Sequence, residues 1–320
     1  MQNQKLVILS SSALGDSLYM SIIAHAYAAH DYDVVFYSDA LFELRTLFPD
    51  INIKNYKDDV MADIGSADQL ILSPESHLIT SGAIDLSIMQ KATLLMIKGM
   101  PSKKIPKSVY KYFKKHGVIL RAHYKNRLII DNMRAYLHEL FPGYITSNPS
   151  GLSIPVSWQR EKNARRIIMH PFSSLPKRSW PLSNFLELAD RLQDQGYKVM
   201  ITASPSERQS LDEYIKRKYD VPDLSLFELA ERYYQSNFFI GNDSGPGHLA
   251  SSLGIPVYTI LFSGRKSFYW EPCFSLATII QPPLYKRLQR KLVSREYYKR
   301  SLSVGRVMGH IADINYQAEE

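Results

Sequence analysis

Residues 241–250 read Gly-Asn-Asp-Ser-Gly-Pro-Gly-His-Leu-Ala, a combination suited to binding phosphate. They follow the apolar residues 238–240 and open a short helical pattern, so we expect a buried strand to pass into a helix here. The unpaired N–H groups and positive dipole end of a helix N-terminus attract anions. Gly245 and Gly247 let a phosphate approach the backbone, and Pro246 suits a first helical turn. The run predicts a phosphate site, although a helix capped by an ordinary Asp or Ser has the same appearance.

A second loop of this kind follows residues 166–171, another apolar strand pattern. It offers the hydroxyls of Ser173 and Ser174 and the ammonium of Lys177 before a helix begins near Pro181. A lysine supplies a point charge to a diphosphate, although Trp-Pro before a helix can serve simply as a packing anchor. Because the carboxyl ends of parallel strands share one edge of a sheet, both loops are expected at the same edge. Together they predict a diphosphate site.

The elements that must position these loops alternate between strand and helix patterns, which indicates parallel βα units. Strands are expected at 5–10, 33–38, 69–73, 93–98, 166–171, 198–203, 238–240 and 257–262, and helices at 126–140, 181–195, 207–218, 226–234 and 245–253, with two earlier helices ending near 30 and 50. The segment 141–155 is rich in Pro and Gly and is the expected linker. We therefore predict an α/β protein of two doubly wound, Rossmann-like domains with the ligand site in the cleft between them.

The expected boundaries give three segments. Residues 1–155 form an N-terminal domain, and residues 156–284 form a C-terminal domain that contains both phosphate-binding loops. Residues 285–320 form a basic helical segment that could pack back on the N-terminal domain.

The composition narrows the class of protein. The 320 residues are 45% hydrophobic and 22% charged, which excludes a disordered chain. No apolar run approaches the roughly 18–20 residues that span a bilayer, and the first residues resemble a strand rather than a signal peptide. The single cysteine, Cys273, excludes an intramolecular disulfide framework and a multi-cysteine zinc site. These features predict a soluble protein of a reducing compartment.

The net charge of +8 is concentrated in two segments. Residues 98–137 hold eleven Lys or Arg and one acid, and residues 286–306 hold eight and one. Such segments predict either surfaces that face an anionic partner or simple solvated helical faces. The lysines singled out for an acceptor or anionic surface are Lys103, Lys104, Lys107 and Lys111. Basic and aromatic residues alternate at 121–127, yet no RNA-binding or helix-turn-helix signature is present, so no nucleic-acid partner is expected.

These motifs resemble glycosyltransferase family 9, the bacterial lipopolysaccharide heptosyltransferases. The similarity rests on H-P-x-S-S-x-x-K-R-x-W-P at 170–181, on Glu207 and Leu224, and on G-N-D-S-G-P-x-H-L-A at 241–250, in that order and spacing. Leu14-Gly15-Asp16 resembles the N-terminal signature of the family. The sequence departs from the family at residues 10–12, where three serines stand in place of a frequent basic residue. The resemblance implies the GT-B fold and an inverting reaction that needs no metal.

The resemblance also implies roles for individual residues. The donor diphosphate would be held by Lys177, Ser244 and Gly245, in a loop lined by Ser173 and Ser174; the ribose would face Glu207, the adenine would pack near Leu224, and the donor sugar or its phosphate would contact Asp243 and His248. Asp16 would be the general base, although its residue type and place equally fit an N-cap of the first helix. Inversion requires such a base, because the acceptor hydroxyl loses its proton as the sugar leaves on the opposite face.

The resulting hypothesis is a transferase that moves heptose from ADP-heptose to the lipopolysaccharide inner core of a Gram-negative bacterium. It predicts no metal and no cofactor beyond the nucleotide-sugar substrate. It also predicts a cytoplasmic protein, peripheral on the anionic inner face of the inner membrane. The alternatives are a relative that uses another nucleotide sugar or a protein acceptor, a nucleotide-sugar epimerase of similar fold, and a non-catalytic nucleotide-sugar binding protein.

Overall fold

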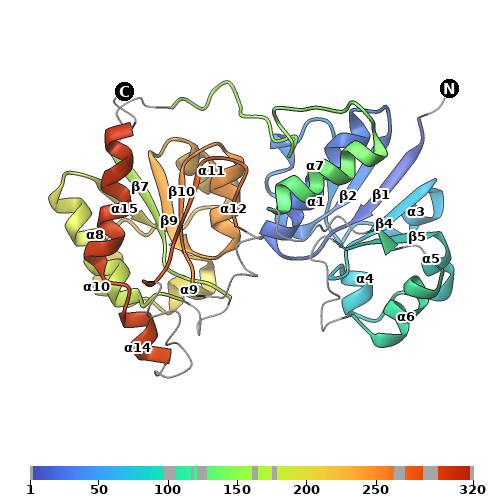
Figure 1. The fold of residues 1–320 in the computed structure, drawn as a ribbon. Helices are drawn as coiled ribbons and strands as arrows, with labels where there is room; N and C mark the ends of the chain where they lie inside the picture. Colours follow the sequence, from blue (N-terminus) through green and yellow to red (C-terminus); the bar gives the residue numbers. More distant parts are fainter. Residues whose placement is uncertain are drawn as a thin grey trace. The chain divides into compact units, whose positions relative to one another are not determined.

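The computed structural model describes residues 3–96, 105–116, 119–120, 128–160, 165–174, 179–262, 271–283 and 295–317. The chain separates into two compact units, Met1–Pro155 and Val156–Glu320. Each unit contains a parallel sheet with helices packed against it (Figure 1). The predicted α/β class, with two doubly wound Rossmann-like halves, is confirmed.

The first unit is built on a six-stranded sheet in the order β3-β2-β1-β4-β5-β6. The strands are β1 (Lys5–Leu9), β2 (Asp33–Tyr37), β3 (Asn52–Lys54), β4 (Gln69–Leu72), β5 (Ala92–Leu95) and β6 (Ile119–Leu120). All neighbouring strands run parallel. The central strands are apolar and almost wholly buried, as strands covered on both faces must be. The strand order reverses between β1 and β4, so the ligand crevice of this fold class is expected at the carboxyl ends of these two strands.

Helices follow most of these strands. They are α1 (Leu14–Ala28), α2 (Asp39–Phe42), α3 (Val60–Ser66), α4 (His77–Thr80), α5 (Leu86–Lys91), α6 (Lys107–His116) and α7 (Ile129–Leu140), with a 3₁₀ turn at Arg45–Leu47. Most side chains of α1 are buried, because this helix packs against both the sheet and α7 (Figure 1). The expected helix 126–140 corresponds to α7.

The second unit contains a five-stranded parallel sheet in the order β11-β10-β9-β7-β8. Its strands are β7 (Arg166–His170), β8 (Lys198–Ile201), β9 (Phe238–Asn242), β10 (Val257–Ile260) and β11 (Ala277–Ile280). Here the strand order reverses between β7 and β9. These are the two strands that the sequence predicts to carry the phosphate-binding loops.

The helices of this unit are α8 (Leu182–Asp194), α9 (Pro205–Gln209), α10 (Glu213–Lys218), α11 (Leu226–Tyr234), α12 (Gly245–Ser252), α14 (Arg295–Arg300) and α15 (Val304–Gln317). The single helix expected at 207–218 is wrong, because two helices occupy this stretch. Asp212 starts the second of them by accepting a hydrogen bond from the Ile215 N–H at 2.8 Å.

The C-terminal helices belong to the second unit. Leu302, Val304 and Val307 are buried in the same apolar core as α8 and one face of the sheet, and α15 lies beside α8 (Figure 1). The Trp180 indole N–H also donates to the Leu302 carbonyl at 3.0 Å. These described residues therefore complete the core of the second unit, and the expectation that the segment packs back on the N-terminal domain stays a prediction.

Candidate active site

The described residues predicted to bind the donor lie on segments at the carboxyl edge of the second sheet. β7 and β9 are hydrogen-bonded neighbours in register, with His170 opposite Gly241. Ser173 and Ser174 follow β7, and the run from Asp243 follows β9, so both loops leave the sheet at its switch point. Ligands of doubly wound sheets bind at such points.

Asn242 joins these two loops, a role that was not predicted from the sequence. Its side chain is 2% exposed. The amide Nδ2 donates to the Pro171 carbonyl at 2.6 Å, and Oδ1 accepts from the Trp180 N–H at 2.8 Å. Asn242 therefore attaches both ends of the loop after β7 to the end of β9. The signal in the sequence was a single amide residue at the end of an apolar strand pattern, which does not show what the amide joins.

Gly241 is required by the close approach of two backbones. A Cβ atom at this position would lie 2.7 Å from the His170 carbonyl oxygen and 2.9 Å from the Phe239 ring. A Cβ on Gly247 would instead meet ordinary neighbours at 3.4 Å and beyond. Of these two glycines, the fold therefore requires Gly241, at the end of the strand.

The junction between β9 and α12 leaves a helix N-terminus without a side-chain cap. Ser244 is the N-cap residue, yet its side chain accepts no capping hydrogen bond. Its Oγ is buried and has no hydrogen-bond partner within the described ranges. Pro246 occupies the first turn as expected, and His248 follows as a buried residue. Ser244 therefore holds the N-cap position without a capping bond of its own, and the geometry suits an anion that would bind the first N–H groups.

A buried polar network lies behind this edge. His170 Nδ1 donates to the Thr202 carbonyl at 2.9 Å, and the Tyr233 hydroxyl donates to Thr202 Oγ1 at 3.1 Å. Burial lowers the pKa of His170 below its ordinary value, and the nearby Glu207 carboxylate opposes this shift. His170 is therefore held as a neutral imidazole whose tautomer is fixed by a backbone carbonyl.

Glu207 and Leu224 belong to two neighbouring segments of the same edge. The Glu207 carboxylate accepts from the Ser204 N–H at 2.8 Å in a capping box that starts α9. The next residue, Arg208, donates to the Val221 carbonyl and pairs with Asp223 at 3.2 Å, which ties α9 to the loop that contains Leu224. The contacts of these residues with ribose and adenine stay predictions.

Asp16 lies at the carboxyl end of β1 in the first unit, at the other switch point. The N-cap of α1 is Ala13, so Asp16 is the third helical residue and its interpretation as the N-cap is wrong. Its side chain is largely buried, and the Ser11 hydroxyl donates to Asp16 Oδ2 at 3.4 Å. Further hydroxyls surround this turn, because Ser10 and Ser38 both bond to Ser17. The Asp16 carboxylate is therefore buried and hydrogen-bonded, just after the carboxyl end of β1.

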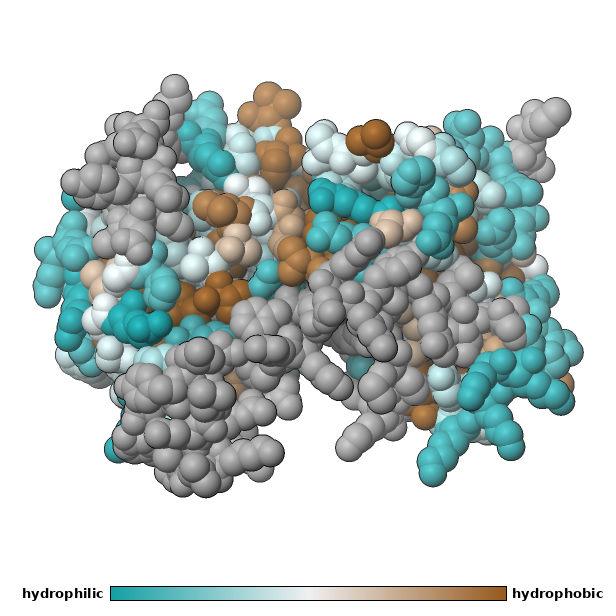
Figure 2. Space-filling model, in the orientation of Figure 1, coloured by the Kyte–Doolittle hydropathy of each residue, from teal (hydrophilic) through white to brown (hydrophobic). Residues whose placement is uncertain are grey.

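Two of the four lysines predicted to form an anionic-partner surface are among the described residues. Lys107 and Lys111 lie on the exposed face of α6, whose opposite face buries Val109 and Phe113. Figure 2 shows hydrophilic surface where Figure 1 places α6. Lys103, Lys104 and Lys177 lie outside the described residues.

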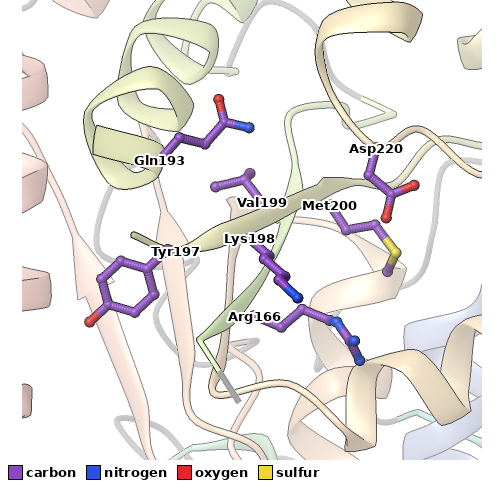
Figure 3. Close-up of a pocket in the computed structure, with 7 residues that line it drawn as sticks. All are labelled: Arg166, Gln193, Tyr197, Lys198, Val199, Met200 and Asp220. Atoms are coloured by element: carbon purple, nitrogen blue, oxygen red, sulfur yellow. The ribbon is translucent and has the colours of Figure 1, made fainter. Parts of the chain in front are cut away.

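A cavity of about 460 Å³ lies at the opposite edge of the second sheet (Figure 3). It is lined by Arg166, Gln193, Tyr197, Lys198, Val199, Met200 and Asp220. Arg166 and Lys198 are the first residues of β7 and β8, so this cavity lies at the amino ends of the strands. It contains none of the residues predicted to bind the donor.

No helix within the described ranges has both the length and the apolar character that a membrane span needs. Exposed apolar side chains occur in separate patches on the face drawn in Figure 2. No group of three or more His, Cys, Asp or Glu residues in the described part of the chain is arranged to hold a metal ion.

Comparisons with known proteins identify relatives of this chain. The model of glycosyltransferase family 9 (heptosyltransferase) matches residues 130–297. Lipopolysaccharide heptosyltransferase 3 of Escherichia coli K12 is 29% identical over 114 residues, which is 33% of each chain. The matched stretch therefore spans about a third of that relative's length.

Solved structures share the fold over nearly the whole chain. The E. coli ADP-heptose lipopolysaccharide heptosyltransferase II has a TM-score of 0.66 and 17% identity, and the comparison covers 99% of this chain and all of that one. A family 9 glycosyltransferase from Veillonella parvula has a TM-score of 0.66 and 16% identity, with 99% and 98% covered. This likeness confirms the predicted GT-B fold.

Proposed function

Because the chain belongs to glycosyltransferase family 9, the heptosyltransferases, we propose that it transfers heptose from ADP-heptose to the inner core of lipopolysaccharide. The observation that carries this proposal is the junction between β9 and α12. A helix N-terminus without a side-chain cap, and with a buried serine hydroxyl beside it, follows a strand at the switch point of a doubly wound sheet. This arrangement suits the diphosphate of a nucleotide sugar.

The donor would bind across the carboxyl edge of the second sheet. The N–H groups at the start of α12 and the Ser244 hydroxyl would bond the diphosphate, together with Lys177 and the loop of Ser173 and Ser174. Asp243 and His248 would contact the heptose or its phosphate. At the far side of the edge, Glu207 would face the ribose and Leu224 the adenine.

Asp16 would act as the general base. As the acceptor oxygen bonds to the anomeric carbon, its proton passes to the Asp16 carboxylate, and the bond from that carbon to the ADP phosphate oxygen breaks on the opposite face. The configuration at the anomeric carbon is therefore inverted. The negative charge that develops on ADP would be stabilised by the N-terminus of α12 and by Lys177, without a metal.

The family and the charge of the first unit support a proposal for the acceptor and for the place of the reaction. The relatives include enzymes named for lipopolysaccharide and for ADP-heptose. The exposed lysines of α6, with Lys103 and Lys104, would face the anionic groups of the core and the inner surface of the inner membrane. We therefore propose a peripheral protein on the cytoplasmic face of that membrane in a Gram-negative bacterium.

A donor screen tests this function. The protein would be incubated with ADP-heptose, other ADP-sugars and UDP-sugars, with and without heptose-deficient core acceptor. The products would be followed by mass spectrometry, and the configuration of the recovered donor sugar by NMR. The proposal expects heptose on the acceptor from ADP-heptose alone. A donor whose mass stays constant while its sugar changes configuration would identify an epimerase. Binding without any conversion would identify a binding protein.

A further inference from the structure

Asp16 has a neighbour that the proposed function does not yet use. Ser76, in the turn between β4 and α4, forms an isolated antiparallel bridge with Ser11, in the turn between β1 and α1. Residues paired in this way have their Cβ atoms roughly 5 Å apart on the same face. Ser76 therefore lies next to Ser11, whose hydroxyl donates to the Asp16 carboxylate.

The backbone fixes Ser76 in this place. The Ser73 N–H donates to the Leu9 carbonyl at 2.8 Å, which extends the pairing of β4 with β1 into the turn. The Ser76 N–H then donates to the Ser73 carbonyl at 3.0 Å. The two turns that follow β1 and β4 are thus joined at the point where the strand order of the sheet reverses.

The hydroxyl of Ser76 is buried and unused. The residue is 0% exposed, and its Oγ has no hydrogen-bond partner among the described residues. It holds the N-cap position of α4 but accepts no capping bond. Its neighbours at this edge differ, since Ser10, Ser11 and Ser38 all bond through their hydroxyls. A buried hydroxyl without a partner is costly, so Ser76 is expected to have one in the working enzyme.

We propose that Ser76 is a positioning residue for Asp16, whose carboxylate it holds by a second hydrogen bond during turnover. The inference rests on the proposed function, in which Asp16 takes the acceptor proton. Ser11 bonds one carboxylate oxygen from one turn, and Ser76 donates from the facing turn. Two hydroxyl donors favour the ionised carboxylate and fix its direction, while lone pairs remain for the acceptor hydroxyl.

Other titratable groups flank the two turns. Tyr19 follows Asp16 by one helical turn on α1, and Glu75 and His77 are the chain neighbours of Ser76. The Tyr56 hydroxyl donates to the Ser10 carbonyl at 2.9 Å, and its ring lies 5.4 Å from that of His77. Burial raises the pKa of Tyr56, so this group stays neutral in the range of an assay. Glu75→Gln and His77→Gln separate the contributions of the two neighbours.

The test compares Ser76→Ala with Ser76→Thr in the full chain, using the pH dependence of kcat for heptose transfer. Donors to a carboxylate lower its pKa, so their loss raises it. Ser76→Ala should therefore move the acid limb of the profile up by about one pH unit, the effect of a single bond to a carboxylate. Ser76→Thr retains the hydroxyl and should keep the wild-type limb. Thermal unfolding should show Ser76→Ala at least as stable as the wild type, because the hydroxyl it removes is buried without a partner.

Ser21→Ala is the matched control. Ser21 is a fully buried serine of α1 whose hydroxyl bonds the Leu18 and Ser150 carbonyls, away from Asp16. Its loss should leave the acid limb in place. If the limb of Ser76→Ala coincides with the wild type while Asp16→Asn is inactive, the positioning role is overturned and the base is retained. If Asp16→Asn stays active, the base of the proposed function is overturned and Ser76 has nothing to position.

Discussion

Among single residues, those at the end of β9 stabilise the fold, and those that follow it are placed to bind a ligand. Gly241 allows the close approach of two backbones, and Asn242 makes two hydrogen bonds within the protein. The next residues, Asp243 and Ser244, begin the part of the run that can face a ligand. Adjacent residues of one motif therefore call for different tests, because some report on folding and others on binding.

Asp16→Asn tests the base. Asparagine preserves the size of the side chain, so the fold and donor binding should survive. It cannot accept the acceptor proton, and kcat should fall by about 10²- to 10⁴-fold. Steady-state transfer rates and calorimetric ADP binding would measure the two effects separately. Near-normal turnover in this variant would place the base elsewhere.

Gly241→Ala tests the close approach of β7 and β9. The added Cβ would lie 2.7 Å from a backbone oxygen that cannot move without shifting a central strand. We expect a loss of roughly 1–3 kcal/mol in the free energy of unfolding, typical of overpacking, measured by urea denaturation. Gly254→Ala provides no control, because that glycine has a positive φ. Gly309→Ala does, since a Cβ there meets nothing within 4 Å; equal effects of both substitutions would contradict the packing argument.

At the scale of elements, α3 is attached to the first sheet through Asp63. Its carboxylate accepts from Lys5 at 2.9 Å, from Lys54 at 2.8 Å and from the Tyr37 hydroxyl at 2.6 Å. Burial works against this charge, but the bonds from Lys54, Tyr37 and Lys5 outweigh it and hold the pKa of Asp63 well below its usual range. The carboxylate thus links one helix to three strands.

Asp63→Asn should therefore destabilise the protein at neutral pH by about 3 kcal/mol, as loss of one partner from a buried ion pair does. Because the pKa of Asp63 is depressed in the folded state, its contribution is present above about pH 4 and declines as the pH falls further. The difference from the wild type should shrink accordingly in denaturation curves at acid pH. Glu187→Gln, which breaks an exposed pair with Arg191, should change little; an equal loss there would refute the role given to burial.

Most of the elements could be predicted because their signals are local. Apolar β-branched runs located the strands, and the breakers between 141 and 155 preceded the boundary of the two units. The features that could not be predicted depend on contacts between residues distant in the sequence. No local pattern shows that Leu302 lies beside Trp180, or that Asn242 joins residues some seventy positions away. Ser76 was missed for the same reason, since only the sheet brings it to Ser11.

At the scale of the whole molecule, the uneven charge predicts how the acceptor is recruited. Replacing Lys107 and Lys111 by Gln, together with Lys103 and Lys104, should raise the acceptor KM and flatten its dependence on salt. The donor KM should stay unchanged, because screened charges act only within about 8–10 Å. Lys198→Gln, an exposed lysine of the second unit, serves as the control. If neither the substitutions nor salt changes the acceptor KM, this surface is a solvated face that does not bind the acceptor.

The function proposed for this family 9 chain is transfer of a heptosyl group from ADP-heptose to a lipopolysaccharide core without a metal. The most direct measurement is the mass of purified heptose-deficient core after incubation with the protein and ADP-heptose in the presence of EDTA. We predict a mass increase of one heptosyl residue and release of an equal amount of ADP, with both changes slowed by about 10²- to 10⁴-fold in Asp16→Asn. An unchanged acceptor mass would overturn the proposed transfer, and activity that EDTA abolishes and Mg²⁺ or Mn²⁺ restores would overturn its independence of metals.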